Sequence, residues 1–487
     1  MRTPILLFFT LITFMACQQM PGTSDPQVDQ LAIENGLIPP ITVKGQPVKK
    51  MNILDRMAYH KVPGVSIAVV NNGTLQWAEG YGQANMAAGT DVDVNTLFQA
   101  GSISKPVAAL AVMKLMQEGR VDLDEDVNTY LKDWKIPDNP YTDKKKVTLR
   151  LLLTHSAGMT VHGFPGYTQK DSFPSIISVL NGKGNTPPIF VDTLPDSIWR
   201  YSGGGYTVME KAVEDVSGMQ LEEYMAGILP DFGMENSTYK QPLPESLHDQ
   251  ASAAYDNQGE IIEGLWHNYP EQAAAGLWTT PTDLAHYCMT VQQILAGEKD
   301  SPLSKAIIER MLTKHRNEWG LGPSLRGEGK DLLFQHGGKN AGFTNEMVAF
   351  AHRGQAVIVM TNGDNGGRLM GDIIRGVAEY YGWDIRKPRE VEIVNVSTDK
   401  LENFTGKFKL DFQVPDIGDY FIDISLKDGQ LFVLDPNNGD TNLLFPLGDD
   451  KFIDLELGDE TQFEVSENRD TVGLLWNGQY QFYKVLE

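Results

Sequence analysis

The chain has 487 residues, 41% of them apolar and 9% aromatic, which is typical of a soluble globular protein with two or three domains. Its formal net charge of −23 argues against nucleic acid as a partner, because phosphates would be repelled. The same charge argues against adhesion to an anionic membrane by charge alone.

The first residues form a segment of their own. Arg2 gives a short positive start, an apolar run covers residues 5–16, and Cys17 follows directly. This run has the length of a signal-peptide core and is too short to span a bilayer. Ala16–Cys17 resembles a bacterial lipobox, in which the cysteine is lipidated. Residues 1–17 are therefore predicted to be a lipoprotein-type signal peptide, with ordinary signal cleavage as the alternative. We expect export to the bacterial periplasm or cell envelope and a membrane anchor on Cys17.

The next segments divide into a tether and the start of a domain. Residues 18–48 are rich in polar residues, Pro and Gly without a sustained apolar period, and are predicted to be a flexible tether. A folded domain is expected over residues 49–385. Near its start, two apolar runs flank Asn71-Asn72-Gly73, which is a strong hairpin signal.

A buried helix is predicted to begin at Ser102. Pro106 fits only near a helix start, so Ser102 and Lys105 are expected in the first turn, and Gly119 is well placed to end the helix. Apolar residues recur at helical spacing along it: Ile103, Val107, Leu110, Met113 and Leu115. Helical segments follow to about residue 320, and a return strand is expected at 356–361. The pattern predicts a mixed α/β core.

The composition changes near the C-terminus. After a linker at residues 386–400, short alternating runs fill residues 401–487, with Ile422 and Ile424 on one face of a strand. Turn signals separate these runs at Asp428-Gly429 and Asn477-Gly478. This part is predicted to be a second, all-β domain, a small barrel or sandwich.

The sequence predicts no disulfide, metal site or cofactor. With Cys17 assigned to a lipid, only Cys288 remains, and its apolar helical context predicts that it packs as a small hydrophobic residue. His155 and His162 are seven residues apart and lack an acidic or cysteine partner at ligand spacing.

Ser102 and Lys105 could carry chemistry. Residues three apart share a helix face, so the Lys105 amine can reach the Ser102 oxygen, and a helix N-terminus favours a developing oxyanion. The alternative is a capping serine beside a solvated lysine. The Ser-x-x-Lys pattern alone does not decide, because it also occurs at 237–240 and 397–400.

Two later elements favour a catalytic Ser102 and Lys105 over a capping serine beside a solvated lysine. Tyr201 precedes three glycines at 203–205, and His336 precedes Gly337 and Gly338 after a predicted strand. In this order and spacing, Ser102-Ile-Ser-Lys105, Tyr201-Ser-Gly203 and His336-Gly-Gly338 resemble the motifs of the serine β-lactamase and penicillin-binding-protein superfamily. The resemblance is to its class C-like branch, which includes class C β-lactamases, DD-carboxypeptidases, D-aminopeptidases and family VIII esterases. "VPGVSIAVV", "LLLTHSAGM", "AAAGLWTTPTDLAHY" and "WGLG" support it over residues 50–385.

The resemblance implies a fold and a mechanism. The fold is α/β (α+β), with an antiparallel sheet and a helical cluster, followed by a small barrel-like all-β domain. Ser102 would form an acyl-enzyme, with Lys105 and Tyr201 sharing the proton transfers. The backbone N–H groups of Ser102 and Lys339 would form the oxyanion hole. His336 would hydrogen-bond the tyrosine or the substrate.

Two departures bear on the substrate, which would be bound by His336, Gly337, Gly338 and Gly203. Gly203 replaces the asparagine that contacts the substrate's amide in the family, and His336 replaces the lysine that β-lactamases present to the β-lactam carboxylate. We therefore expect an exported serine hydrolase acting on esters or D-amino-acid-containing amides or peptides. A β-lactamase or penicillin-binding DD-peptidase is the alternative. A non-catalytic binding protein that keeps the fold is the alternative of another class.

Overall fold

The computed structural model describes residues 26–299, 302–414, 417–437, 439–466 and 470–485. The predicted signal peptide and Cys17 lie outside these residues. Among the helices of the described part, none is both long and apolar enough to cross a bilayer.

A seven-stranded antiparallel sheet forms the centre of the larger domain, in the order β4-β3-β2-β10-β9-β8-β7. The expected hairpin joins β2 to β3 through Asn72 and Gly73, at φ values of 53° and 74°. The return strand predicted at 356–361 is β10. The strands are β2 (Gly64–Asn71), β3 (Thr74–Asn85), β4 (Thr90–Asp91), β7 (Ser324–Arg326), β8 (Leu333–Asn340), β9 (Phe343–Phe350) and β10 (Ala356–Thr361).

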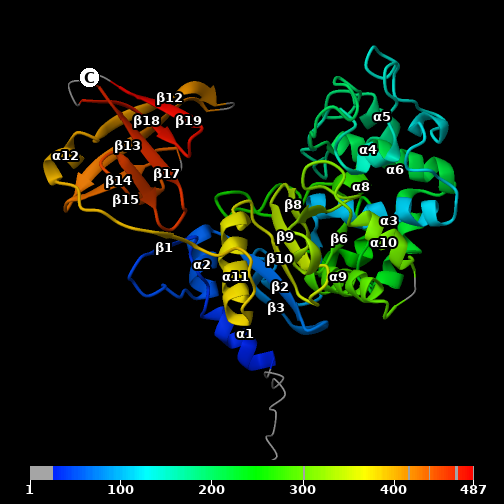
Figure 1. Ribbon diagram of the computed structural model, residues 1–487, viewed down its shortest axis with the longest axis horizontal. Coiled ribbons are helices and arrows are strands. Elements are labelled where there is room, and N and C mark those ends of the chain that lie inside the picture. The colour runs from blue at the N-terminus through cyan, green and yellow to red at the C-terminus, as the bar shows by residue number, and fades with distance from the viewer. Residues whose placement is uncertain (1–25, 300–301, 415–416, 438, 467–469, 486–487) are drawn as a thin grey trace, which may run out of the picture.

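Helices cover both faces of this sheet (Figure 1). Along β2, Ile67 and Val69 belong to one hydrophobic core, and Ala68 and Val70 belong to another, because successive strand residues face opposite sides. The first core is closed by α1 (Pro26–Glu34), α2 (Ile53–His60) and α11 (Gly366–Tyr381). The second lies under α9 (Pro281–Ala296), where Cys288 is buried as predicted.

The second core continues into a helical lobe, which contains α3 (Ser104–Gln117), α4 (Leu149–Leu153), α5 (Ile176–Leu180), α6 (Gly203–Ser217), α7 (Leu221–Ala226), α8 (Gln272–Ala275) and α10 (Lys305–Met311). A short pair, β5 (Phe98–Gln99) and β6 (Trp278–Thr279), leads from the sheet into this lobe. The antiparallel sheet and helical cluster agree with the fold that the sequence implied.

The C-terminal domain is a closed up-and-down barrel, which confirms the all-β prediction and selects the barrel over the sandwich. The predicted turns at Asp428-Gly429 and Asn477-Gly478 have positive φ values and join neighbouring strands. Helix α12 (Thr398–Glu402) leads into the strands β12 (Gly406–Val414), β13 (Gly418–Lys427), β14 (Gln430–Leu434), β15 (Thr441–Pro446), β16 (Lys451–Asp454), β17 (Glu460–Val465), β18 (Thr471–Trp476) and β19 (Tyr480–Lys484).

The tether expected at residues 18–48 is wrong for its described part. Helix α1 packs Ile33 into the core beside α11, and strand β1 (Ile41–Val43) pairs in parallel with β11 (Arg389–Val391) in the linker. Ile41 also meets Val391 and the barrel residue Ile453 in a small hydrophobic cluster. The apolar residues of this segment contact distant parts of the chain at irregular intervals, so no period in the sequence showed them.

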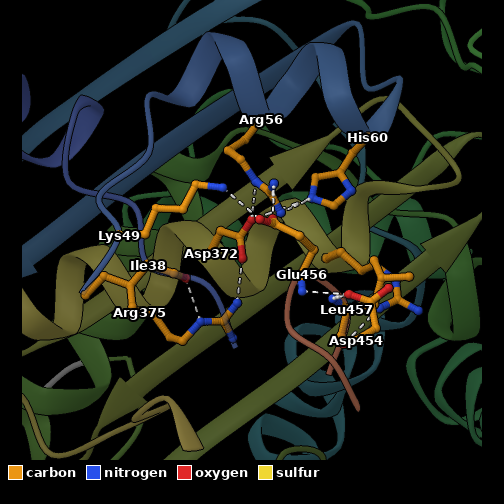
Figure 2. A network of polar contacts seen from close by, with 10 residues as sticks. Ile38, Lys49, Arg56, His60, Asp372, Arg375, Asp454, Glu456 and Leu457 are labelled. Atoms are coloured by element: carbon orange, nitrogen blue, oxygen red, sulfur yellow. Dashed lines mark hydrogen bonds and ion pairs between the residues drawn. The ribbon is translucent and has the colours of Figure 1, made fainter. Parts of the chain in front are cut away.

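A polar network connects the barrel to the larger domain (Figure 2). The Arg56 guanidinium on α2 donates to Asp372 of α11 at 2.8 Å and to Glu456 of the barrel at 2.7 Å. In the same network Lys49 pairs with Glu456 at 2.8 Å and Arg375 with Asp372 at 2.6 Å, and the His60 ring lies 3.0 Å from the Arg56 guanidinium. Arg56 and Asp372 are both buried, so each charge depends on the others for its solvation.

Candidate active site

Ser102 lies in a 3₁₀ turn (Gly101–Ile103) directly before α3, which begins at Ser104. The α-helix therefore starts two residues later than the sequence predicted, and only Lys105 is in its first turn. The Ser104 hydroxyl donates to the Gly101 carbonyl at 2.6 Å and stabilises the change from 3₁₀ to α geometry. As a result Ser102 is partly exposed while Ile103 and Ser104 are buried.

Lys105 is not a solvated lysine. It is 2% exposed, and its Nζ lies 2.9 Å from the Ser102 Oγ and 2.7 Å from the Ala274 carbonyl oxygen. Burial disfavours the ammonium and lowers the pKa of Lys105 to about 7. At neutral pH a substantial fraction of Lys105 is thus a neutral amine, which can accept a proton from Ser102.

The other two Ser-x-x-Lys matches lack this environment. The Ser237 hydroxyl donates to Asp283, and Lys240 is exposed. Ser397 precedes the short helix α12 without making a side-chain capping hydrogen bond, and Lys400 pairs with Asp449 on the surface.

Tyr201 completes the group around the nucleophile. The Lys105 Nζ lies 5.0 Å from the centre of the Tyr201 ring. Its hydroxyl is buried without a hydrogen-bond partner among the described residues. Burial raises the pKa of Tyr201, and the nearby Ser102 hydroxyl opposes part of that rise. Tyr201 is therefore a protonated phenol beside Ser102 and Lys105, suited to donate a proton.

Ser202 orients this part of the chain. Its backbone is extended, at φ −144° and ψ 115°, and its Oγ accepts a hydrogen bond from the Gly205 N–H, which caps α6. The same hydroxyl donates to the Thr160 carbonyl at 2.8 Å.

His336 lies on β8 and is buried. Its Nδ1–H donates to the Gly337 carbonyl at 2.6 Å, which leaves Nε2 as an acceptor without a partner among the described residues. Burial and the neighbouring Lys105 lower the pKa of His336 to about 3. Of the two partners expected for His336, the Tyr201 hydroxyl is not hydrogen-bonded to its Nε2 in the described structure, and the substrate stays a prediction.

Two glycines allow β8 to approach the nucleophile turn. A Cβ at Gly338 would lie 1.9 Å from the Ala100 carbonyl oxygen, and a Cβ at Gly101 would lie 2.5 Å from the Lys339 backbone nitrogen. Gly101 also has a φ of 54°, which a residue with a side chain rarely adopts. The backbone of Lys339 is thus adjacent to the turn that holds Ser102, as an oxyanion hole from these two residues requires. The Lys339 ammonium pairs with Asp364 at 2.5 Å.

Sequence reasoning missed the aromatic residues around Tyr201, among them His162, whose ring centre lies 5.0 Å from that of Tyr201. His155, considered only as a metal ligand, stacks on Tyr201 with ring centres 4.1 Å apart and accepts a hydrogen bond from the Ser202 N–H at 3.1 Å. Trp319 meets Tyr201 and His336 edge-on at 5.9 Å and 5.6 Å. Both lie in stretches that carried the family resemblance, "LLLTHSAGM" and "WGLG", which was the available signal.

Comparison with known proteins agrees with this geometry. Residues 51–381 match the profile of the family described as Beta-lactamase. A teichoic acid D-alanine hydrolase of Staphylococcus aureus is 23% identical over 247 residues, 50% of this chain and 58% of that protein. The chain spans about 60% of the length of the curated relatives it matches.

Two solved structures share the fold. An octameric penicillin-binding protein homologue from Pyrococcus abyssi has a TM-score of 0.61 and 24% identity, covering 89% of this chain and 98% of that one. The D-amino acid amidase from Ochrobactrum anthropi SV3 has a TM-score of 0.57 and 20% identity, covering 73% and 98%.

Proposed function

This chain belongs to the β-lactamase family of serine hydrolases, and we propose that it hydrolyses esters or amides of D-amino acids through an acyl-enzyme on Ser102. The observation that carries the proposal is the buried contact of 2.9 Å between the Lys105 amine and the Ser102 hydroxyl, beside a third motif whose histidine is uncharged.

The mechanism follows from the positions of the polar atoms. Neutral Lys105 takes the Ser102 proton as Oγ bonds to the substrate carbonyl carbon, and the backbone N–H groups of Ser102 and Lys339 bind the resulting oxyanion. The Tyr201 phenol gives its proton to the leaving alcohol or amine as that bond breaks, and Lys105 returns the serine's proton to Tyr201. Water then attacks the acyl-enzyme, loses a proton to the same pair and releases the acid, while Ser102 regains its proton.

The charges around the nucleophile favour substrates without a carboxylate next to the scissile bond. His336 stands where β-lactamases present a lysine, and its low pKa keeps it neutral. The nearby Lys339 ammonium is already paired with Asp364. β-Lactams and DD-peptides carry a carboxylate, which would find no charged partner at His336. D-aminoacyl esters and amides carry no such carboxylate. The names of two similar proteins, a teichoic acid D-alanine hydrolase and a D-amino acid amidase, support this substrate class.

A substrate panel on the purified protein tests the proposal. We expect turnover of para-nitrophenyl acetate and of D-alanine para-nitroanilide, with slower or no turnover of D-alanyl-D-alanine and nitrocefin. Ser102→Ala should abolish turnover and labelling by a fluorophosphonate. Faster hydrolysis of nitrocefin than of the D-alanine substrate would favour the β-lactamase alternative. Absence of both turnover and Ser102-dependent labelling would favour the non-catalytic binding protein.

We propose further that the protein is exported and anchored at the cell envelope through a lipid on Cys17, on the strength of the N-terminal sequence. Expression with a radiolabelled fatty acid should label the wild-type protein, and Cys17→Ala should remove the label. Labelling that persists in Cys17→Ala would contradict the anchor.

A further inference from the structure

Position 203 has no room for a side chain. A Cβ built on Gly203 would lie 2.9 Å from Cε2 of Phe164 and 3.1 Å from the His162 carbonyl oxygen. The Gly203 N–H donates to that same carbonyl at 2.9 Å, so the two backbones are held together. The Phe164 ring thus occupies the space that an asparagine side chain would need here.

The loop that carries Phe164 lies beside the group around the nucleophile. The His162 ring of this loop lies next to the Tyr201 ring, with ring centres 5.0 Å apart. Tyr201 in turn lies beside Lys105, whose Nζ contacts the Ser102 hydroxyl. The Phe164 ring is therefore next to the position where the acyl part of a substrate on Ser102 would lie.

The loop that carries Phe164 is firmly held. Val161, a β-branched residue, has a φ of 62°, a strained conformation that persists only where surrounding contacts impose it. Its carbonyl accepts a hydrogen bond from the Gly204 N–H at 3.0 Å. The Ser202 hydroxyl, which donates to the adjacent Thr160 carbonyl, also lies 3.2 Å from the Val161 carbonyl oxygen. Phe164 itself is partly buried against the helical core. A substrate would therefore meet the ring in place.

We propose that Phe164 is a specificity-determining residue, whose ring makes the acyl side of the site apolar and excludes acyl groups with an amide next to the reacting carbonyl. This inference rests on the proposed function and narrows it to amino acids with a free amine, as opposed to N-acylated ones. The acetamide of an N-acylated substrate is bulkier than a free ammonium and would meet the ring that fills this space, whereas an ammonium is attracted to the face of an aromatic ring. Overpacking of this kind disfavours N-acylated substrates by about tenfold to a hundredfold.

Two substrates with the same leaving group test this inference: D-alanine para-nitroanilide and N-acetyl-D-alanine para-nitroanilide. The measurement is the ratio of their kcat/KM values, acetylated over free. Phe164→Ala should raise this ratio at least about fivefold by making room for the amide. The double variant Phe164→Ala/Gly203→Asn should raise the ratio further, since the asparagine amide then has room to hydrogen-bond the substrate's amide.

Gly203→Asn alone should lower the melting temperature, because the new side chain meets the Phe164 ring. Phe173→Ala, at a phenylalanine 39% exposed, is the control and should leave the ratio unchanged.

The outcomes separate the inference from the proposed function. A wild-type enzyme that cleaves the acetylated substrate as well as the free one, or an unchanged ratio in Phe164→Ala, overturns the role of Phe164 and leaves the hydrolase proposal standing. A wild-type enzyme that cleaves no ester or anilide overturns the proposed function and the inference with it. Phe164→Ala decides the question even where the double variant does not fold.

Discussion

The Lys105 amine lies among groups that solvate it poorly. Its hydrogen-bond partners are one carbonyl oxygen and the Ser102 hydroxyl, and the rings of Tyr201 and Tyr206 flank it at 5.0 Å and 5.7 Å. No carboxylate contributes to the shift of its pKa, which burial alone lowers. This is the environment in which a lysine serves as a base at neutral pH.

The activity should therefore depend on pH through Lys105. Because the neutral amine is the base and the pKa of Lys105 is about 7, kcat/KM should rise from pH 5.5 and level off above about pH 8. Initial rates with D-alanine para-nitroanilide from pH 5 to 9 measure this. Lys105→Arg, which stays protonated throughout, should lose about a hundred- to ten-thousand-fold in kcat. A wild-type profile that stays flat down to pH 5 would remove Lys105 as the base.

Tyr201→Phe should separate catalysis from stability. Its hydroxyl has no hydrogen-bond partner among the described residues, so its loss should leave the melting temperature unchanged while kcat falls about a hundred- to ten-thousand-fold. The matched control is Tyr206→Phe. The Tyr206 hydroxyl donates to the Leu153 carbonyl at 3.0 Å, so this change should cost about 1 kcal/mol of stability and leave kcat near wild type. Unchanged turnover in Tyr201→Phe would exclude the phenol from proton transfer.

At the scale of elements, α8 depends on α6. Helix α8 has only four residues, too few to be stable alone, yet its Ala274 carbonyl holds Lys105. The Glu210 carboxyl on α6 accepts a hydrogen bond from the Ala273 N–H at 2.8 Å, and Glu210 is 2% exposed. Burial raises the pKa of Glu210 well above its usual value. Glu210 is thus a positioning residue for Lys105.

Two variants of Glu210 distinguish its hydrogen bond from its charge. Glu210→Ala leaves the buried Ala273 N–H without a partner, which should cost about 1–3 kcal/mol of unfolding free energy and lower kcat. Glu210→Gln keeps an acceptor oxygen for the Ala273 N–H and should preserve both the stability and kcat. Denaturant unfolding and kcat at neutral pH measure these effects. A Glu210→Gln variant as impaired as Glu210→Ala would mean that the acid itself is required.

At the scale of the whole molecule, Arg56 links the larger domain to the barrel. Arg56→Ala leaves buried Asp372 with less of its charge compensation and removes a partner from Glu456. Breaking a buried pair of this kind should cost about 3–5 kcal/mol. Calorimetry measures the loss, and limited proteolysis should cut the linker at residues 386–400 faster as the barrel separates.

The control for Arg56 is Lys44→Ala. Lys44 pairs with Glu392 on the surface, where the two side chains are 62% and 72% exposed, so this change should cost less than about 1 kcal/mol. Equal effects of the two substitutions would mean that the Arg56 network does not hold the barrel in place.

Local signals in the sequence predicted local structure well. The Asn72-Gly73 hairpin, the alternation at Ile422 and Ile424, and the buried helix after Ser102 are all present, because each depends on neighbours within a few residues. The prediction failed at residues 26–48, where Ile33 and Leu37 are buried in the core that contains α11, and Ile41 is buried against the barrel. Nothing near them in the sequence indicates those partners.

The active site shows the same difference between local signals, which the sequence carries, and long-range contacts, which it does not. The order and spacing of Ser102, Lys105, Tyr201 and His336, and with them the kind of chemistry, can be read from the residues alone. The charge of each group depends on how the chain folds around it. The lowered pKa values of Lys105 and His336 arise from burial by elements far apart in the chain. Phe164 lies over Gly203 because two distant loops are hydrogen-bonded to each other, and such long-range contacts have no signature in local sequence.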